Sequence, residues 1–131
     1  LTVKTVSGTG VLVPAGSTVQ LYSDGTNINS GLLTKGYYTT TSAYTAVNND
    51  QVIVDTSGGV VTLTLPASPS VGNEVTIIDG KGSFNTNNLT LNRNGSNING
   101  AASNLTVSTN GTAFTLVYLN ATRGWAYKDK I

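Results

Sequence analysis

The pattern of apolar and polar positions follows a period of two over much of the chain. Its clearest case is residues 60–65, where Val61, Leu63 and Leu65 occupy every second position with threonines between them. Because successive side chains of a strand point to opposite faces, this spacing predicts a strand with these three residues turned inward. Two prolines follow and end the strand, since proline has no backbone N–H to donate to a neighbouring strand.

Other short apolar runs predict further strands. They fall at residues 11–13, 19–22, 75–78, 89–92, 105–108, 113–119 and 125–127. The run Phe114–Leu119 carries apolar residues on both faces, so we expect a central strand of a sheet or a strand that a neighbouring chain covers. No window of a dozen residues keeps an apolar spacing of three and four, so we expect essentially no helix.

Turn residues separate these runs. Asn94-Gly95 and Asn110-Gly111 are dipeptides that suit two-residue hairpin turns, so pairing between consecutive strands is expected. A polar stretch rich in tyrosine and threonine, over about residues 31–44, marks a change in texture. We therefore expect an N-terminal β-rich segment and linker at 1–43 and a module at 44–131. The predicted fold is all-β, with an antiparallel β-sandwich or a small β-barrel-like domain after the N-terminal segment.

Composition narrows the classes of function. The 131 residues include 7 Lys and Arg, 6 Asp and Glu, and neither His nor Cys, for a formal net charge of +1. This balance gives no basic surface for nucleic acid, so no nucleic-acid partner is expected. No apolar run reaches the roughly 18–20 residues that span a bilayer, so no membrane insertion is expected. Because the first residue is Leu1, we expect a processed product or a segment of a longer protein.

Candidate catalytic chemistry is sparse. Without histidine, a Ser-His type of nucleophile–base pair is excluded, and a zinc site would have only carboxylates as ligands. Two carboxylates that hydrolyse a glycosidic bond would have to come from Asp24, Asp50, Asp55, Glu74, Asp79 and Asp129. Most of these aspartates stand in turn contexts, where the side chain ordinarily bonds its own backbone. We therefore expect no enzymatic activity, no catalytic residues, no cofactor and no metal.

Aromatic and amide side chains are the remaining candidates for binding. Tyr37 and Tyr38 lie in the polar stretch and are candidates for contact with a receptor or partner. Trp125, near Arg123, either stacks on a sugar ring or packs against the sheet, and packing is the favoured interpretation. The asparagine-rich stretches 85–88 and 92–99 bind a saccharide, stack between identical chains or complete tight turns, and the turn interpretation leads.

Short motifs follow one another in a fixed order through the second part of the chain. They are Asp55-Thr56-Ser57-Gly58-Gly59, Val61-Thr62-Leu63-Thr64-Leu65-Pro66, Ile77-Ile78-Asp79, Asn87-Asn88-Leu89-Thr90-Leu91, Asn94-Gly95-Ser96, Ile98-Asn99-Gly100, Leu116-Val117-Tyr118 and Arg123-Gly124-Trp125. The ordered set, over about residues 44–127, resembles a β-rich module that recurs in tail-fibre and other virion structural proteins of tailed bacteriophages. The earlier pieces at 8–16 and 22–27 are similar to a segment found near that module.

The resemblance implies a structural protein of the virion, on an external appendage, and it brings no catalytic residues with it. Fibres of this kind are generally homotrimers, so it implies a homotrimer in contact with other virion proteins. The leading expectation is a tail-fibre segment that contributes to host receptor recognition and attachment, with a host-surface glycan as candidate ligand. The alternative is a capsid decoration or head-fibre protein without a receptor-binding role. A polysaccharide-degrading spike is disfavoured because the chain is too short for a long repeat array and a catalytic cleft.

Overall fold

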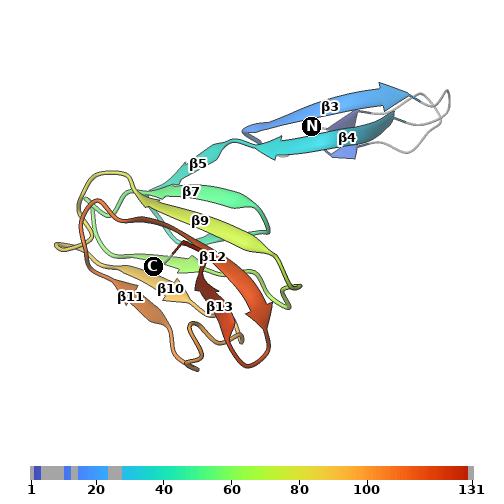
Figure 1. Cartoon of the computed structure of the whole chain (residues 1–131). Coiled ribbons are helices and arrows are strands. Elements are labelled where there is room, and N and C mark those ends of the chain that lie inside the picture. The colour runs from blue at the N-terminus through green and yellow to red at the C-terminus, as the bar shows by residue number, and fades with distance from the viewer. Residues whose placement is uncertain (1, 4–10, 13–14, 24–27, 130–131) are drawn as a thin grey trace. The chain divides into compact units, whose positions relative to one another are not determined.

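The computed structural model describes residues 2–3, 11–12, 15–23 and 28–129 (Figure 1). These residues form strands, turns and loops without a helix, so the all-β prediction is confirmed. Within that part of the chain, no helix has the length and apolar character needed to cross a membrane. The chain divides into two compact units, residues 1–37 and 38–131, and the division lies within the polar stretch that the sequence marks.

The described residues of the first unit form two antiparallel strand pairs. One pair joins β1 (Thr2–Val3) to β2 (Val11–Leu12), and the other joins β3 (Ser17–Ser23) to β4 (Ile28–Lys35). The predicted strands at 11–13 and 19–22 correspond to β2 and β3, although Val13 lies outside the described residues. After the two predicted strands the sequence indicates only a further extended segment, because Asn29, Ser30 and Gly31 interrupt the apolar run of β4. The structure shows that this segment is a strand, paired antiparallel with β3.

The second unit contains two mixed sheets. The five-stranded sheet has the order β13 (Gly124–Tyr127), β12 (Ala113–Asn120), β9 (Glu74–Asp79), β7 (Asp50–Val54), β5 (Tyr37–Thr40). The four-stranded sheet has the order β11 (Leu105–Val107), β10 (Leu89–Asn92), β8 (Val61–Thr64), β6 (Tyr44–Thr45). Because β12 lies between β9 and β13, the prediction of a central strand at 114–119 is confirmed.

The path of the chain explains why the sheets are mixed. From β6 to β10, successive strands alternate between the two sheets, so that β6, β8 and β10 run parallel in one sheet and β7 and β9 run parallel in the other. Parallel neighbours need a crossover connection, and here a strand of the opposite sheet provides it (Figure 1). The later strands β11, β12 and β13 pair antiparallel. The antiparallel and barrel-like parts of the prediction are thus corrected, because both sheets are mixed and they do not close into a barrel.

One hydrophobic core lies between the inner faces of the two sheets. Val61, Leu63 and Leu65 are at most 2% exposed, and Val60 is 74% exposed, so the predicted inward face is confirmed. Alternate residues of the other sheet complete the same cluster, including Ile77 of β9. Each fully buried side chain of this size stabilises the fold by about 1.5–3 kcal/mol, so the two layers depend on each other for stability.

The predicted turn dipeptides do form turns, but neither closes a hairpin. Asn94 and Gly95 both have positive φ, 47° and 90°, as a tight turn of this kind requires. They lie within the long connection from β10 to β11, while Asn110-Gly111 leads from β11 in one sheet to β12 in the other. The expected pairing of consecutive strands is therefore confirmed for β10 and β11, which pair antiparallel across a connection longer than a two-residue turn. It is wrong for β11 and β12, which lie in different sheets.

Candidate functional site

Two of the acidic residues considered for catalysis serve local turns. Asp50 Oδ2 accepts bonds from the Val47 N–H at 2.8 Å and the Tyr44 hydroxyl at 2.9 Å. Asp55 Oδ1 accepts bonds from the Ser57 N–H at 2.9 Å and the Ser57 hydroxyl at 2.6 Å. These are the contacts expected of aspartates at turns, so that prediction is confirmed for both, while Asp24 lies outside the described residues.

Asp79 holds two loops together. Its carboxylate accepts bonds from the backbone N–H groups of Lys81, Ser83 and Phe84 in its own loop, at 3.2–3.4 Å. It also accepts one at 3.0 Å from Gly111, in the corner between β11 and β12. Partial burial acts to raise the pKa of Asp79, but these N–H donors outweigh it and hold the pKa below its usual range. Among the described residues, no group of three acidic side chains gathers where it would hold a metal ion.

We expect Asp79→Asn to lower the free energy of unfolding by about 1–3 kcal/mol at pH 7, because the amide loses the charge and part of the acceptor capacity that the four N–H groups use. The lowered folded-state pKa means that the carboxylate stabilises the fold above its unfolded pKa, near 4. This contribution is lost as the pH falls through the folded-state pKa. Urea unfolding of both proteins at neutral and acidic pH should therefore show the difference shrinking in acid.

The control for this prediction is Asp55→Asn, which removes a carboxylate whose hydrogen bonds within the described part of the chain go to nearby Ser57. Its pKa is also lowered, chiefly by the hydroxyl and N–H of Ser57, but no second loop depends on it. We expect a much smaller loss of stability than for Asp79→Asn. Equal losses in the two variants would show that the bond to Gly111 adds nothing.

Asparagine amides also connect turns that are distant in sequence. Each of three Nδ2 groups donates at 2.9 Å to a backbone carbonyl: Asn87 to Thr56, Asn94 to Leu65, and Asn97 to Thr122. The turn interpretation of the asparagine-rich stretches is thus confirmed for these three residues. Their amides are engaged within the fold and do not face a ligand.

The tyrosines predicted to bind a partner are exposed. Tyr37 is 60% exposed and Tyr38 is 45% exposed, both on β5 at one edge of the five-stranded sheet. As successive residues of a strand, they point to opposite faces and do not form one surface. The Tyr38 ring lies 4.6 Å from that of Tyr44, between centroids. Burial, followed by the bond to Asp50, raises the pKa of Tyr44 to about 12.

The other two predicted binding residues lie at the opposite edge of that sheet. Arg123 is exposed in the turn between β12 and β13. Trp125 is fully buried on the inner face of β13, where its ring meets Tyr118 edge-on at 5.7 Å between centroids. Its Nε1–H has no hydrogen-bond partner among the described residues. The packing interpretation of Trp125 is therefore the correct one, and its role as a ligand contact is corrected, because the core covers the ring.

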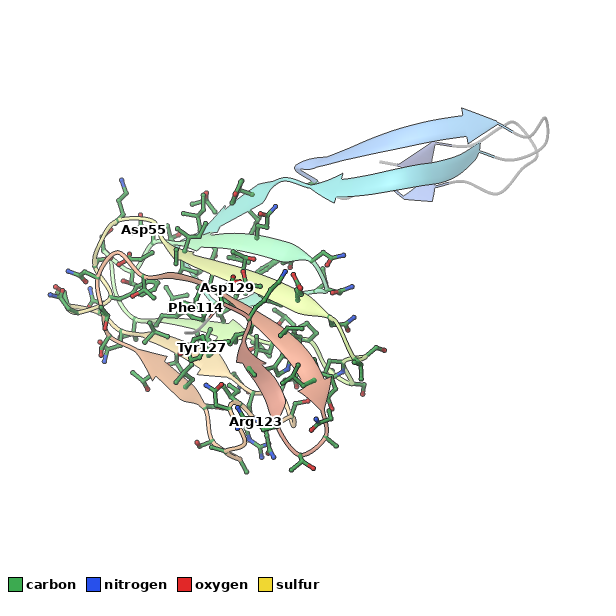
Figure 2. The ribbon with its side chains drawn as sticks, in the orientation of Figure 1. Asp55, Phe114, Arg123, Tyr127 and Asp129 are labelled. Carbon is green, nitrogen blue, oxygen red and sulfur yellow. The ribbon has the colours of Figure 1, made fainter. Side chains whose placement is uncertain are left out.

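A groove of about 700 Å³ lies beside β11 and β12. It is lined by Thr76, Ile78, Thr106, Val107, Ser108, Thr109, Thr112, Ala113, Phe114, Thr115, Tyr127 and Asp129. Half of these residues are threonine or serine, and one is charged. Figure 2 shows Phe114, Tyr127 and Asp129 near one another, with Arg123 away from them at the end of the β12–β13 hairpin.

The sheet register positions the side chains of the groove. Thr115 pairs with Thr76 across β12 and β9, and their hydroxyls are 2.8 Å apart. Phe114 points to the other face of β12, where it meets Tyr127 edge-on at 5.3 Å between centroids. Burial raises the pKa of Tyr127, so its hydroxyl stays protonated. The sequence analysis did not find this groove, although hydroxyl residues gather at 106–115.

No protein-family model matches the chain, and no curated protein is significantly similar to it. The groove supplies hydroxyls, two aromatic rings and one carboxylate, which is a set of groups suited to holding a polar ligand by hydrogen bonds and packing.

Proposed function

We propose that the chain is a non-catalytic structural module of a bacteriophage virion, a segment of a tail fibre or similar appendage that contributes to host receptor recognition and attachment. One observation carries the proposal: the motif residues that resemble the phage module are the residues that hold this fold together. Asp79 joins two loops, Asn94 joins two turns, and Trp125 fills the core. Because these residues stabilise the fold, they support a structural role for the protein.

The surface of the second unit supports assembly with other copies. Val60 and Val71 are 74% and 75% exposed, so a neighbouring subunit would have apolar side chains to cover. The two sheets also end in edge strands, including β5 and β11, whose unpaired backbone groups are commonly covered in an assembly. The proposal therefore includes a homotrimer, in which neighbouring subunits cover such edges and apolar residues.

Light scattering of the purified chain tests the assembly. A trimer has three times the 13.5 kDa mass of one chain, about 40 kDa, and we expect this mass to persist on dilution to micromolar concentration. A monomer at all concentrations would contradict the proposed trimer.

Electron microscopy of virions of a phage whose genome encodes this chain tests where on the virion the chain lies. Gold-labelled antibodies against the chain should bind a tail appendage. Label on the head would instead favour the capsid decoration or head-fibre alternative, and virions without label would contradict both. A reducing-sugar assay on host polysaccharide should show no release, and release would overturn the non-catalytic role.

A further inference from the structure

We propose that the groove beside β11 and β12 binds an uncharged saccharide. This inference rests on the proposed function and deepens it, because it gives the receptor contact a place and a ligand class. The tyrosines and the arginine expected from the sequence lie elsewhere: none of them lines this groove.

Hydroxyl groups give the groove its hydrogen-bonding character. Thr106, Ser108 and Thr109 follow one another along β11 and the connection after it, and all three line the groove. A hydroxyl both donates and accepts, so a row of them matches the hydroxyls of a sugar, which also do both. A ligand with acceptors alone would leave half of this capacity unused.

Two aromatic rings give the groove an apolar surface. Phe114 and Tyr127 are partly buried, and both line the groove beside Ile78 and Val107. Sugar rings carry C–H groups on their faces, which pack against aromatic side chains while the hydroxyls at the ring edge reach polar partners. Concave sites that combine apolar walls with a few directed polar groups are typical of small-molecule binding.

The charges select an uncharged ligand. Among the described residues that line the groove, Asp129 is the one that carries a charge, and its carboxylate would repel an acidic sugar. Lys128 is next to it in sequence, but its Nζ lies 3.0 Å from Glu74 Oε1 and pairs with that carboxylate. A carboxylate accepts strong hydrogen bonds from hydroxyls, so Asp129 favours a ligand rich in them.

The same count argues for binding without cleavage. Hydrolysis of a glycosidic bond ordinarily needs two carboxyl groups on either side of the bond. The described residues lining the groove include one carboxylate, Asp129. The groove therefore holds a saccharide and releases it unchanged.

Binding to defined saccharides tests the proposal with the full chain. The probes are immobilised di- to tetrasaccharides of glucose, galactose and N-acetylglucosamine, each beside its sialylated or sulfated form. We expect binding to at least one neutral probe and weaker binding to its acidic form. Titration of the best soluble neutral probe into isotope-labelled protein should shift the backbone amides of residues 106–115 and 127–129.

A matched pair of variants locates the site. Phe114 and Tyr118 lie on the same face of β12, and each meets another ring edge-on, but only Phe114 lines the groove. We expect Phe114→Leu to weaken binding of the neutral probe about tenfold, which corresponds to about 1.4 kcal/mol. Tyr118→Leu should change it less than about twofold. Circular dichroism would verify that both variants fold.

A second pair keeps the test independent of core packing. Asp129 is exposed, so its replacement should not disturb the core. We expect Asp129→Asn to weaken binding of the neutral probe severalfold and Asp55→Asn to leave that binding unchanged. Three outcomes would overturn the inference: no binding of any neutral probe at millimolar concentration, a preference for the acidic probes, or amide shifts that cluster at Tyr37 and Tyr38 instead. Loss of self-association in Phe114→Leu would also overturn it, because a second copy would then occupy the groove.

The two proposals fail in different ways. Gold label on the virion together with no saccharide binding would overturn the groove inference and leave the structural role intact. Saccharide binding by the groove, with no label on the virion, would overturn the proposed function alone.

Discussion

Replacing Trp125 with alanine is expected to lower the free energy of unfolding by about 3–5 kcal/mol, the largest loss from one side chain in this core. Trp125 is fully buried, lies edge-on to Tyr118 and is the largest of the fully buried side chains. Its removal leaves a cavity beside Tyr118. Backbone pairing fixes β12 and β13 in place, so they do not easily move to fill it. Since small domains are stable by about 5–15 kcal/mol, this loss is a large part of the total stability. Urea unfolding followed by circular dichroism measures the loss, because the variant has no tryptophan to fluoresce.

The variant Trp125→Phe separates packing from hydrogen bonding. Phenylalanine keeps an aromatic ring in the core but removes the Nε1–H, which has no hydrogen-bond partner among the described residues. No hydrogen bond to a described residue is lost, so we expect less than half of the loss seen with alanine. A loss equal to that of alanine would show that the indole N–H has a partner that stabilises it.

Local alternation was enough to predict most strands of the second unit. Val61, Leu63 and Leu65 turn inward as their spacing predicts, and β9, β10 and β12 begin and end within two residues of the expected runs. β7 was missed. Its apolar run is only Val52–Val54, which is too short to distinguish from a loop without knowledge of its neighbour.

The parallel pairing of strands was not predicted, although the sequence contains a trace of it. Residues 61–64 read Val-Thr-Leu-Thr and residues 89–92 read Leu-Thr-Leu-Asn, and the structure pairs the two segments in parallel and in register. Paired positions of these two strands carry similar residues because both face the same core: Val61 and Leu63 pair with Leu89 and Leu91, and all four are buried. Turn dipeptides favoured hairpins instead, since a local pattern carries no information on which sheet the chain enters next.

The groove was beyond local patterns for a related reason. Its walls come from β9, β11, β12 and the end of β13, segments that only the two-sheet arrangement brings together. The sequence suggested that Phe114 and Tyr127 belong to the core. Both do pack against it, but they are only partly buried, and both also line the groove. Trp125 was correctly favoured as a core residue, because a large aromatic side chain near the end of the chain gains more by packing against the sheet.

Replacing Gly124 with alanine is expected to lower the free energy of unfolding by about 2–5 kcal/mol, because two costs add. Gly124 has a φ of +68°, a conformation that is unfavourable for residues with a side chain. A Cβ at this position would also overlap the backbone carbonyl of Asn97 and lie 2.8 Å from its Cα. That carbonyl accepts the Trp125 N–H at 2.8 Å, so the loop cannot move away without losing a bond to β13 and exposing Ile98.

Gly111→Ala isolates the first of these costs. Gly111 has nearly the same φ, +69°, but a Cβ there would meet nothing within 4 Å. We expect a loss of about 1–2 kcal/mol, the cost of the backbone conformation alone. Urea unfolding of both variants gives the difference, which measures how tightly the loop around Asn97 is held against β13. If the two glycines proved equally replaceable, that loop would be free to shift, and the close approach that buries Ile98 and Trp125 would not be what stabilises this end of the core.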